Sequence, residues 1–204
     1  MMMGVFKRNI FLDNLKKILY ILLFGPILFF LSCEEDNVEI IEDEIIEIGD
    51  IYQGGIVFYI DSTGQHGLVS AHNDIDKYPW GCFETDIIGA VDTYIGAGSS
   101  NTLNIVENCI HTSITAAQAC IDFESNGFDD WYLPSRDELL LMYNNIGLSS
   151  QDTLINNFNT GWHWSSSQVN SGYAFVVSFN APIGGFIAEF NKYTSYRVRP
   201  TRSF

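Results

Sequence analysis

The segment from Gly127 to Leu141 has the sequence Gly-Phe-Asp-Asp-Trp-Tyr-Leu-Pro-Ser-Arg-Asp-Glu-Leu-Leu-Leu and decides how the chain around it is organised. Its first glycine favours the left-handed conformation that ends a helix. The run Trp131–Leu133 is short and apolar, as in a buried strand, and the proline after it blocks continuation. Ser135 with Glu138 forms a Ser-x-x-Glu capping box. The segment therefore predicts a helix end, a strand and a helix start in about a dozen residues.

Upstream of this segment, the sequence predicts a β-hairpin over residues 54–72. Ile56–Ile60 is an apolar strand, a turn follows around Gly64, and Gly67–Ala71 returns as the second strand. Residues 72–108 are rich in Gly, Asp, Ser and Thr. We expect ordered loop there, because its scattered apolar side chains need burial: Trp80, Phe83, Ile87, Ile88, Val91 and Ile95.

Two helices and a run of strands are predicted for the rest of the chain. The first helix spans Ser113 to Glu124, with Ala117, Cys120 and Ile121 on one stripe and Gly127 as its end. The second spans Ser135 to Ile146, with Leu139, Tyr143 and Ile146 facing inward and Gly147 after it. The hydrophobic period then changes to two, which predicts strands at Trp162–Ser165, Tyr173–Phe179, Gly185–Phe190 and Tyr196–Arg199. This order of elements is typical of an α+β fold.

Residues 1–32 have the composition of an export signal. Lys7, Arg8, Lys16 and Lys17 form a basic region, and residues 18–31 are apolar but too few to span a bilayer comfortably. The signal ends at Phe30-Leu31-Ser32-Cys33, which resembles a bacterial lipobox with Phe30 where leucine is usual. We therefore expect a lipoprotein signal peptide at 1–32 and lipidation of Cys33. An uncleaved membrane anchor or an ordinary signal peptide is the alternative.

Residues 33–48 are predicted to be an acidic tether before a single domain at residues 49–204. Charge repulsion keeps such a segment extended, and it has no periodic face to bury. An acidic run directly after a lipidated cysteine also resembles the signal that sends some lipoproteins to the surface of the outer membrane. A spacer on the periplasmic face is the alternative. Both place the domain outside the cytoplasm, anchored to the outer membrane.

The charge of the domain limits its partners. The chain has 10 Lys+Arg and 25 Asp+Glu, and residues 1–32 contribute four of the bases and one of the acids. Nine further acids lie within residues 34–50, so 15 acids and 6 bases remain after residue 50. A surface of that sign does not attract nucleic acid, anionic lipid or sulfated polysaccharide by long-range steering. It is compatible with neutral sugars, cationic ligands or protein partners.

Several motifs occur in a fixed order along residues 49–204. They are residues 49–58 (Gly-Asp-Ile-Tyr-Gln-Gly-Gly-Ile-Val-Phe), Trp80-Gly81-Cys82, Asn101-Thr102, Ala116-Ala117 with Cys120, the segment quoted above, Trp164-Ser165-Ser166-Ser167 and Val198-Arg199-Pro200. This set resembles the Lcl C-terminal domain family, named for a bacterial collagen-like adhesin, in the C-type-lectin-like superfamily. The resemblance implies two helices packed on antiparallel β-sheet with long loops, and a last strand that returns beside the first. It also implies adhesion, and the namesake is linked to sulfated glycosaminoglycans, which the acidic charge disfavours here.

Three cysteines remain if Cys33 is lipidated, which is an odd number for an oxidising compartment. Three pairings are open, and Cys109–Cys120 is favoured because it closes the shortest loop. Cys82 is then left over. Formylglycine-generating enzymes belong to the same superfamily and use cysteine chemistry, so an enzyme of that type with Cys82 as its thiol is one alternative function. No basic residue lies near enough in sequence to lower the pKa of that thiol, which favours a buried, inert cysteine.

No other catalytic or metal-binding pattern is found. Ser165-Ser166-Ser167 lacks a Gly-x-Ser-x-Gly elbow, and the histidines have no metal spacing (His66, His72, His111 and His163). His72-Asn73-Asp74 with Asp76 is the densest ligand cluster, but such clusters usually serve turns. The Glu-Pro-Asn, Gln-Pro-Asp and Trp-Asn-Asp triplets of calcium-dependent sugar-binding C-type lectins are absent. We expect no enzyme activity and no cofactor, and leave a structural calcium open.

Aromatic and amide side chains concentrate in the last third of the chain and suggest a binding face. Aromatic rings stack on apolar faces of a ligand, and amides satisfy hydroxyl groups. The candidate ligand-binding residues are Trp162, Tyr173, Tyr193, Asn170, Asn191, Arg197 and Arg199. Trp164, Phe175 and Phe179 are expected in the core. The arginines, with Arg202, either bind an anionic ligand or pair with acids such as Asp137 or Glu189.

Together these features predict a cell-envelope lipoprotein whose domain binds or adheres to a glycan or to an envelope or host protein. A purely structural envelope interaction module is a further alternative. The sequence leaves open the ligand, the disulfide pairing, the oligomeric state, the calcium dependence and the side of the outer membrane.

Overall fold

The computed structural model describes residues 45–110, 113–147, 158–180 and 183–204. Residues 44–204 form one compact unit. The expected signal peptide, the lipidation site at Cys33 and most of the tether therefore lie outside the described residues, as does His111. Within the described ranges, no helix is long and apolar enough to cross a membrane.

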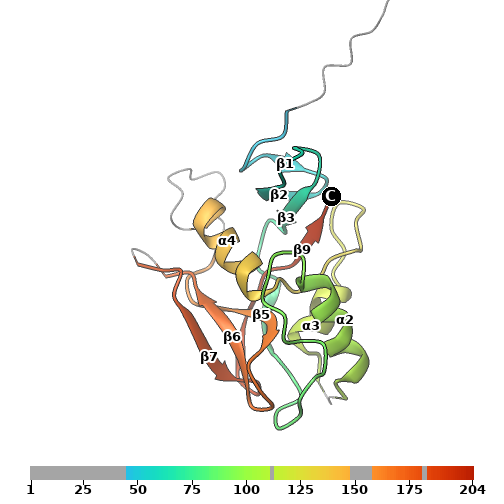
Figure 1. Ribbon diagram of the computed structural model, residues 1–204, viewed down its shortest axis with the longest axis vertical. Helices are drawn as coiled ribbons and strands as arrows, with labels where there is room; N and C mark the ends of the chain where they lie inside the picture. The colour runs from blue at the N-terminus through green and yellow to red at the C-terminus, as the bar shows by residue number, and fades with distance from the viewer. Residues whose placement is uncertain (1–44, 111–112, 148–157, 181–182) are drawn as a thin grey trace, which may run out of the picture. The chain divides into compact units, whose positions relative to one another are not determined.

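The fold is α+β, with two sheets and three described helices (Figure 1). A four-stranded sheet has the order β1-β2-β3-β9, formed by Ile51–Tyr52, Gly55–Ile60, Gly67–Ser70 and Thr201–Ser203. A five-stranded sheet has the order β4-β8-β5-β6-β7, formed by Asp76–Pro79, Ser195–Val198, Trp162–Gln168, Tyr173–Ser178 and Ile187–Asn191. The pairing of β5 with β8 is parallel and the other described pairings are antiparallel.

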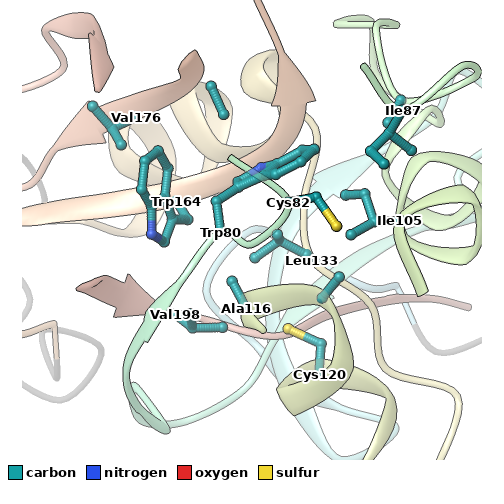
Figure 2. Close-up of a cluster of buried hydrophobic side chains, with 13 residues drawn as sticks. Trp80, Cys82, Ile87, Ile105, Ala116, Cys120, Leu133, Trp164, Val176 and Val198 are labelled. Atoms are coloured by element: carbon teal, nitrogen blue, oxygen red, sulfur yellow. The ribbon is translucent and has the colours of Figure 1, made fainter. Parts of the chain in front are cut away.

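The helices are α2 (Gly98–Asn108), α3 (Ala116–Ile121) and α4 (Arg136–Ile146). Helix α4 contacts β2 of the first sheet and β5 and β6 of the second, so it links the two sheets. Helices α2 and α3 contact each other and lie side by side in Figure 1, with α2 against β5 and α3 against β4. The buried side chains between these helices and the five-stranded sheet include Trp80, Trp164 and Val198 (Figure 2).

The predicted hairpin and the second predicted helix are confirmed. β2 and β3 pair antiparallel on either side of the turn at Gly64. In α4, Ser135 accepts a hydrogen bond from the Glu138 backbone N–H, and the Glu138 carboxylate accepts one from the Ser135 N–H at 2.8 Å. Gly147 follows the last turn, and the inward residues Leu139, Tyr143 and Ile146 are buried. A capping box needs no tertiary context, which is why sequence locates this helix so well.

The first predicted helix is confirmed as α3, but it is shorter than residues 113–124: it begins after the N-cap Thr115 and ends at Ile121. Two further predictions around the quoted segment are wrong. Gly127 does not end α3; Asn126 and Gly127 both have positive φ and form the turn that joins Ser125 to Phe128. Trp131–Leu133 is buried but is not a strand, because a single bridge joins Tyr132 to Thr201.

α2 lies where the sequence predicted loop. Its inward stripe contains Asn101 and Thr102 beside Ile105, so the hydrophobic period is weak. Thr102 bonds the carbonyl of Leu133, and Asn101 bonds that of Asp92. Polar contacts to other segments therefore take the place of an apolar face.

The C-terminal strand returns to the N-terminal sheet but lies beside β3. β9 pairs with β3 through Leu68, Val69 and Ser70, whereas the resemblance implied a position beside the first strand. The N- and C-terminal parts of the domain nevertheless meet in one sheet, since β1, β2, β3 and β9 are its four members.

Candidate functional site

The disulfide of the domain joins Cys82 to Cys109, with a Cα–Cα distance of 5.5 Å. The predicted pairing of Cys109 with Cys120 is wrong, and so is the expectation that Cys82 is left over. Cys120 is the free cysteine among the described residues; it is fully buried, and burial raises the pKa of its thiol. The sequence favoured the shorter loop, but α2 places Cys109 beside the turn that carries Cys82. A cysteine in a disulfide has no free thiol to act as a nucleophile, so Cys82 does not support the formylglycine-type alternative.

The turn after Trp80 is held in an unusual backbone conformation. Gly81, Cys82 and Glu84 all have positive φ, at 99°, 48° and 67°. Left-handed conformations cost energy for residues other than glycine, and they persist where surrounding contacts determine the backbone. The result is that Phe83, between Cys82 and Glu84, is 40% exposed rather than buried as the sequence suggested. Ile88, Val91 and Ile95 are likewise exposed, whereas Trp80 and Ile87 are buried as expected.

Lys192 connects this turn to the five-stranded sheet through hydrogen bonds. The Gly81 N–H donates to the Lys192 carbonyl at 3.1 Å, and the Lys192 Nζ donates to the Thr85 carbonyl at 3.0 Å. The same ammonium group donates to Gln168 Oε1 at 2.9 Å and lies 4.4 Å from the centroid of the Trp80 ring. Lys192 is fully buried, and burial lowers its pKa to about 8.

Around the backbone of Lys192, the chain brings together Phe83, Asn170, Tyr173, Asn191 and Tyr193, a group that we call the aromatic–amide surface. Tyr173 and Asn191 are directly opposite each other on β6 and β7. The Phe83 and Tyr193 rings meet edge to face, with centroids 5.0 Å apart. Tyr173 is 41% exposed and Tyr193 61% exposed. Four of the residues predicted to bind ligand are thus gathered at one end of the sheet.

The amides of this surface retain hydrogen-bonding capacity. Asn170 Oδ1 accepts from the N–H groups of Gly172 and Tyr173, at 2.9 and 3.1 Å, which fixes the amide and leaves its NH2 group to point elsewhere. The Asn191 side chain makes no hydrogen bond within the described parts of the chain. Gly172 lies against Phe83, since a Cβ placed there would be 3.5 Å from the ring. Rigid rings next to free amide donors are suited to a hydroxylated ligand.

Trp162 and Arg197 lie away from this surface. Trp162 is the first residue of β5, opposite Ser178, whereas the surface lies at the other end of β6. Its half-buried ring packs edge to face on Phe190. Arg197 donates from Nε to the Thr160 carbonyl at 3.0 Å and lies across from Lys77. Neither side chain joins the other candidates, because sequence proximity within strands does not tell which end of the sheet a residue occupies.

Arg199 is not available to a ligand, so its prediction as a binding residue is wrong. Its side chain is fully buried, and its Nε donates to Asp74 Oδ1 at 2.8 Å. Its Nη1 donates to the Ala71 carbonyl, and the guanidinium stacks over Phe158. The alternative, that the arginines pair with acids inside the domain, is confirmed for Arg199 and Arg202, but with acids other than those expected. Arg199 pairs with Asp74 and Arg202 with Asp130, whereas Asp137 pairs with its neighbour Arg136.

His163 completes a buried polar cluster around Asp74. His163 Nε2 lies 3.1 Å from Asp74 Oδ1, and Asp74 Oδ2 accepts from the backbone and side chain of Asn159. Burial lowers the pKa of His163, while the hydrogen bonds and the Arg199 charge hold the pKa of Asp74 far below its ordinary value. The cluster found in the sequence around Asp74 thus joins β4 to β5 and the C-terminal segment. No group of acids, histidines and cysteines in the described ranges is arranged to hold a metal ion.

The comparisons with known proteins concern the fold. No protein-family model matches the chain, and neither does any curated protein. A solved structure of a fimbrial protein from Bacteroides ovatus ATCC 8483 is similar, with a TM-score of 0.50 and 13% sequence identity. The similarity covers 76% of this chain and 45% of the fimbrial chain, so the chain spans less than half the length of that protein. At this identity the likeness is one of fold alone.

Proposed function

We propose that the domain is a non-catalytic binding module that holds a neutral glycan on the aromatic–amide surface. The observation that carries the proposal is the gathering of three partly exposed rings and two amides at one end of the sheet. Sugars present apolar ring faces that stack on aromatic side chains and hydroxyl groups that bond to amides. The surface is built on a disulfide-linked turn and a strand pair, which gives the rings a fixed geometry before ligand arrives.

The charge of the domain supports a neutral rather than a sulfated ligand. Of the six basic residues after residue 50, Arg199 and Lys192 are buried and Arg202 is paired with Asp130. The remaining ones are Lys77, Arg136 and Arg197, and Arg136 pairs with Asp137. The same part of the chain has 15 Asp and Glu residues. Long-range attraction of a polyanion is therefore weak.

Two further parts of the proposal rest on the sequence. The resemblance to Lcl C-terminal domains supports a C-type-lectin-like fold, and β9 does return to the N-terminal sheet, although beside β3 rather than beside the first strand. The lipobox at Phe30–Cys33 supports anchoring of the chain to the outer membrane through a lipid on Cys33. Radiolabelled palmitate incorporation that persists in a Cys33→Ser variant would contradict the lipid anchor.

A glycan array tests the binding function. The compact unit from residue 44 onward would be applied in calcium and in chelator, beside Tyr193→Ala and Tyr173→Ala variants. The matched control is Tyr94→Ala, since Tyr94 is 59% exposed but lies in the loop before α2. We expect saturable binding to a neutral glycan that survives chelation, is lost in the first two variants and is kept in the control. Absence of glycan binding, together with capture of envelope or host proteins, would favour a protein partner instead.

A further inference from the structure

The four edge strands of the two sheets differ in how they are protected. β1 has two residues and β9 has three, and β4 carries Lys77 and Pro79. Short strands, lysine and proline are devices that keep an edge from pairing with another chain. β7 is the longest of the four edges, with five residues, Ile-Ala-Glu-Phe-Asn, and has neither lysine nor proline; its one charged side chain is Glu189. It is therefore the edge best suited to receive another strand.

Along β7, the backbone N–H and C=O groups of successive residues point alternately toward β6 and away from it. Ser178 N–H donates to the Phe186 carbonyl and Lys192 N–H to the Gly172 carbonyl, so residues 186 and 192 belong to hydrogen-bonded pairs with β6. Since such pairs alternate along an antiparallel ladder, residues 188 and 190 also bond to β6. The N–H and C=O groups of Ile187 and Glu189 consequently point away from β6. Within the described ranges no strand pairs with that side of β7.

The side chains along this edge define the chemistry of a partner. Ile187 is 42% exposed, and Phe186 just before β7 is 56% exposed. Glu189 is the charged residue of β7; it is exposed and makes no ion pair with the described residues. Cross-strand pairs are favourable between apolar residues or opposite charges and unfavourable between like charges. An incoming strand is thus favoured if it places an apolar residue opposite Ile187 and a base opposite Glu189.

Charge also selects among the possible occupants of the edge. If a second copy of the domain paired with β7 about a two-fold axis at Ala188, the two Glu189 carboxylates would be diagonal cross-strand neighbours. Each domain also has 15 acids and 6 bases after residue 50, so two copies repel each other. The N-terminal tether is strongly acidic and would meet Glu189 with like charge. Both occupants are therefore disfavoured relative to a basic strand from another protein.

We propose that β7 is a docking edge for an extended segment of a partner protein, with Lys or Arg opposite Glu189. Main-chain hydrogen bonds to Ile187 and Glu189 give the affinity, and the charge pair sets the register. This function is separate from glycan binding, since the edge uses outward backbone groups and the aromatic–amide surface uses rings and amides. A variant that loses strand docking can still be tested for glycan binding, and the reverse also holds.

Two synthetic peptides test the edge with the full chain purified in detergent. Both alternate valine and threonine over ten residues with blocked ends, and one has a central lysine where the other has glutamate. We expect the lysine peptide to bind about threefold to tenfold more tightly than the glutamate peptide by fluorescence anisotropy. In Glu189→Lys this preference should reverse. The matched control Glu107→Lys makes the same charge change on the exposed face of α2 and should keep the original preference.

Hydrogen exchange separates edge pairing from other modes of binding. The lysine peptide should slow exchange at the amides of Ile187 and Glu189 and leave those of Ala188 and Phe190 unchanged. Glu189→Pro removes one outward N–H without removing a bond to β6, so it should abolish peptide binding in a chain that stays folded. Equal binding of both peptides, binding by neither, or unchanged binding to Glu189→Pro would overturn the proposal. A concentration-dependent dimer that Glu189→Pro dissociates would assign the edge to a second copy instead.

Discussion

The ammonium group of Lys192 lies 4.4 Å from the centroid of the Trp80 ring and is buried beneath the turn that presents Phe83. It donates hydrogen bonds to the Thr85 carbonyl and to Gln168 Oε1; no carboxylate in the described residues forms an ion pair with it, and the charge of Asp86 only partly offsets the effect of burial on its pKa. A buried cation without an ion-pair partner lowers the free energy of unfolding, so Lys192 reduces stability while it fixes the position of the binding surface.

The first prediction concerns alkaline pH. Burial lowers the pKa of Lys192 to about 8 from the ordinary 10.5, so between these values the unfolded chain binds more protons than the folded one. The burial cost is full below pH 8 and is relieved as pH rises, so the free energy of unfolding should rise by about 2 kcal/mol between pH 7.5 and 9.5. Urea denaturation of the wild type and of Lys192→Met measures this, and the variant should lack the rise. Parallel pH profiles for the two chains would show that Lys192 is not buried as a cation.

A second prediction concerns the buried ion pair. Asp74→Asn should lower the free energy of unfolding by about 3–5 kcal/mol, because it leaves the Arg199 guanidinium buried without its charge partner. Asp130→Asn is the matched control. It also breaks a carboxylate–arginine pair, but the Asp130 side chain is 54% exposed, so we expect a loss of about 1 kcal/mol or less. Denaturant midpoints at pH 7 measure both. Equal losses would mean that solvent reaches the Asp74 pair as well.

A third prediction concerns His163 at acidic pH. Burial lowers the pKa of His163, so at and below its ordinary pKa the folded domain holds fewer protons on this ring than the unfolded chain does. The unfolded chain takes up a proton below about pH 6.5, and stability should therefore fall as pH decreases from 7 to 5. His163→Gln should flatten this part of the profile, and His66→Gln at an exposed turn position should not. Thermal melts across this range decide between the two outcomes.

The fourth prediction concerns the start of α2. A methyl group at Gly98 would overlap the Glu138 carboxylate, and it would come within 2.9 Å of the Ser135 backbone nitrogen. That carboxylate closes the capping box and also accepts the Gly96 N–H, so it cannot move freely. Gly98→Ala should cost about 3 kcal/mol, although alanine is the better helix former.

Gly64→Ala provides the comparison for this change. Gly64 has a φ of +75° but nothing within 4 Å of an added Cβ, so the cost should stay near 1 kcal/mol. Urea denaturation at neutral pH separates the two. A larger loss in Gly64→Ala would mean that backbone conformation outweighs the contact between α2 and α4.

Local signals in the sequence were enough for elements whose cause is local. The hairpin β2–β3 and the capped helix α4 depend on a turn glycine and on Ser135 with Glu138, which are neighbours in sequence. α2 was missed because its buried Asn101 and Thr102 bond to Asp92 and Leu133, partners that only the fold brings close.

The binding surface was found in part for the same reason. Tyr173, Tyr193, Asn170 and Asn191 gather where β6 and β7 pair, so strand pattern was a useful guide. Phe83 was missed because it comes from a distant loop and was expected to be buried. Only glycine signals a left-handed backbone in the sequence, and Cys82 and Glu84 adopt this conformation without being glycine. The turn that exposes Phe83 could therefore not be predicted from the sequence.

The last prediction concerns the thiols of the domain. In a chain with Cys33 replaced by serine, the Cys82–Cys109 disulfide leaves Cys120 as the single thiol, and it is fully buried. A thiol reagent should find no group in the folded protein and one group after unfolding in urea. Replacing both Cys82 and Cys109 by alanine should cost about 3–4 kcal/mol, since their separation of 27 residues sets the loop entropy that the disulfide removes. Because the disulfide also holds the turn of Phe83, the same variant should lose glycan binding before it loses its fold. Peptide mapping that finds Cys109 joined to Cys120 would contradict this pairing and return Cys82 to the free form.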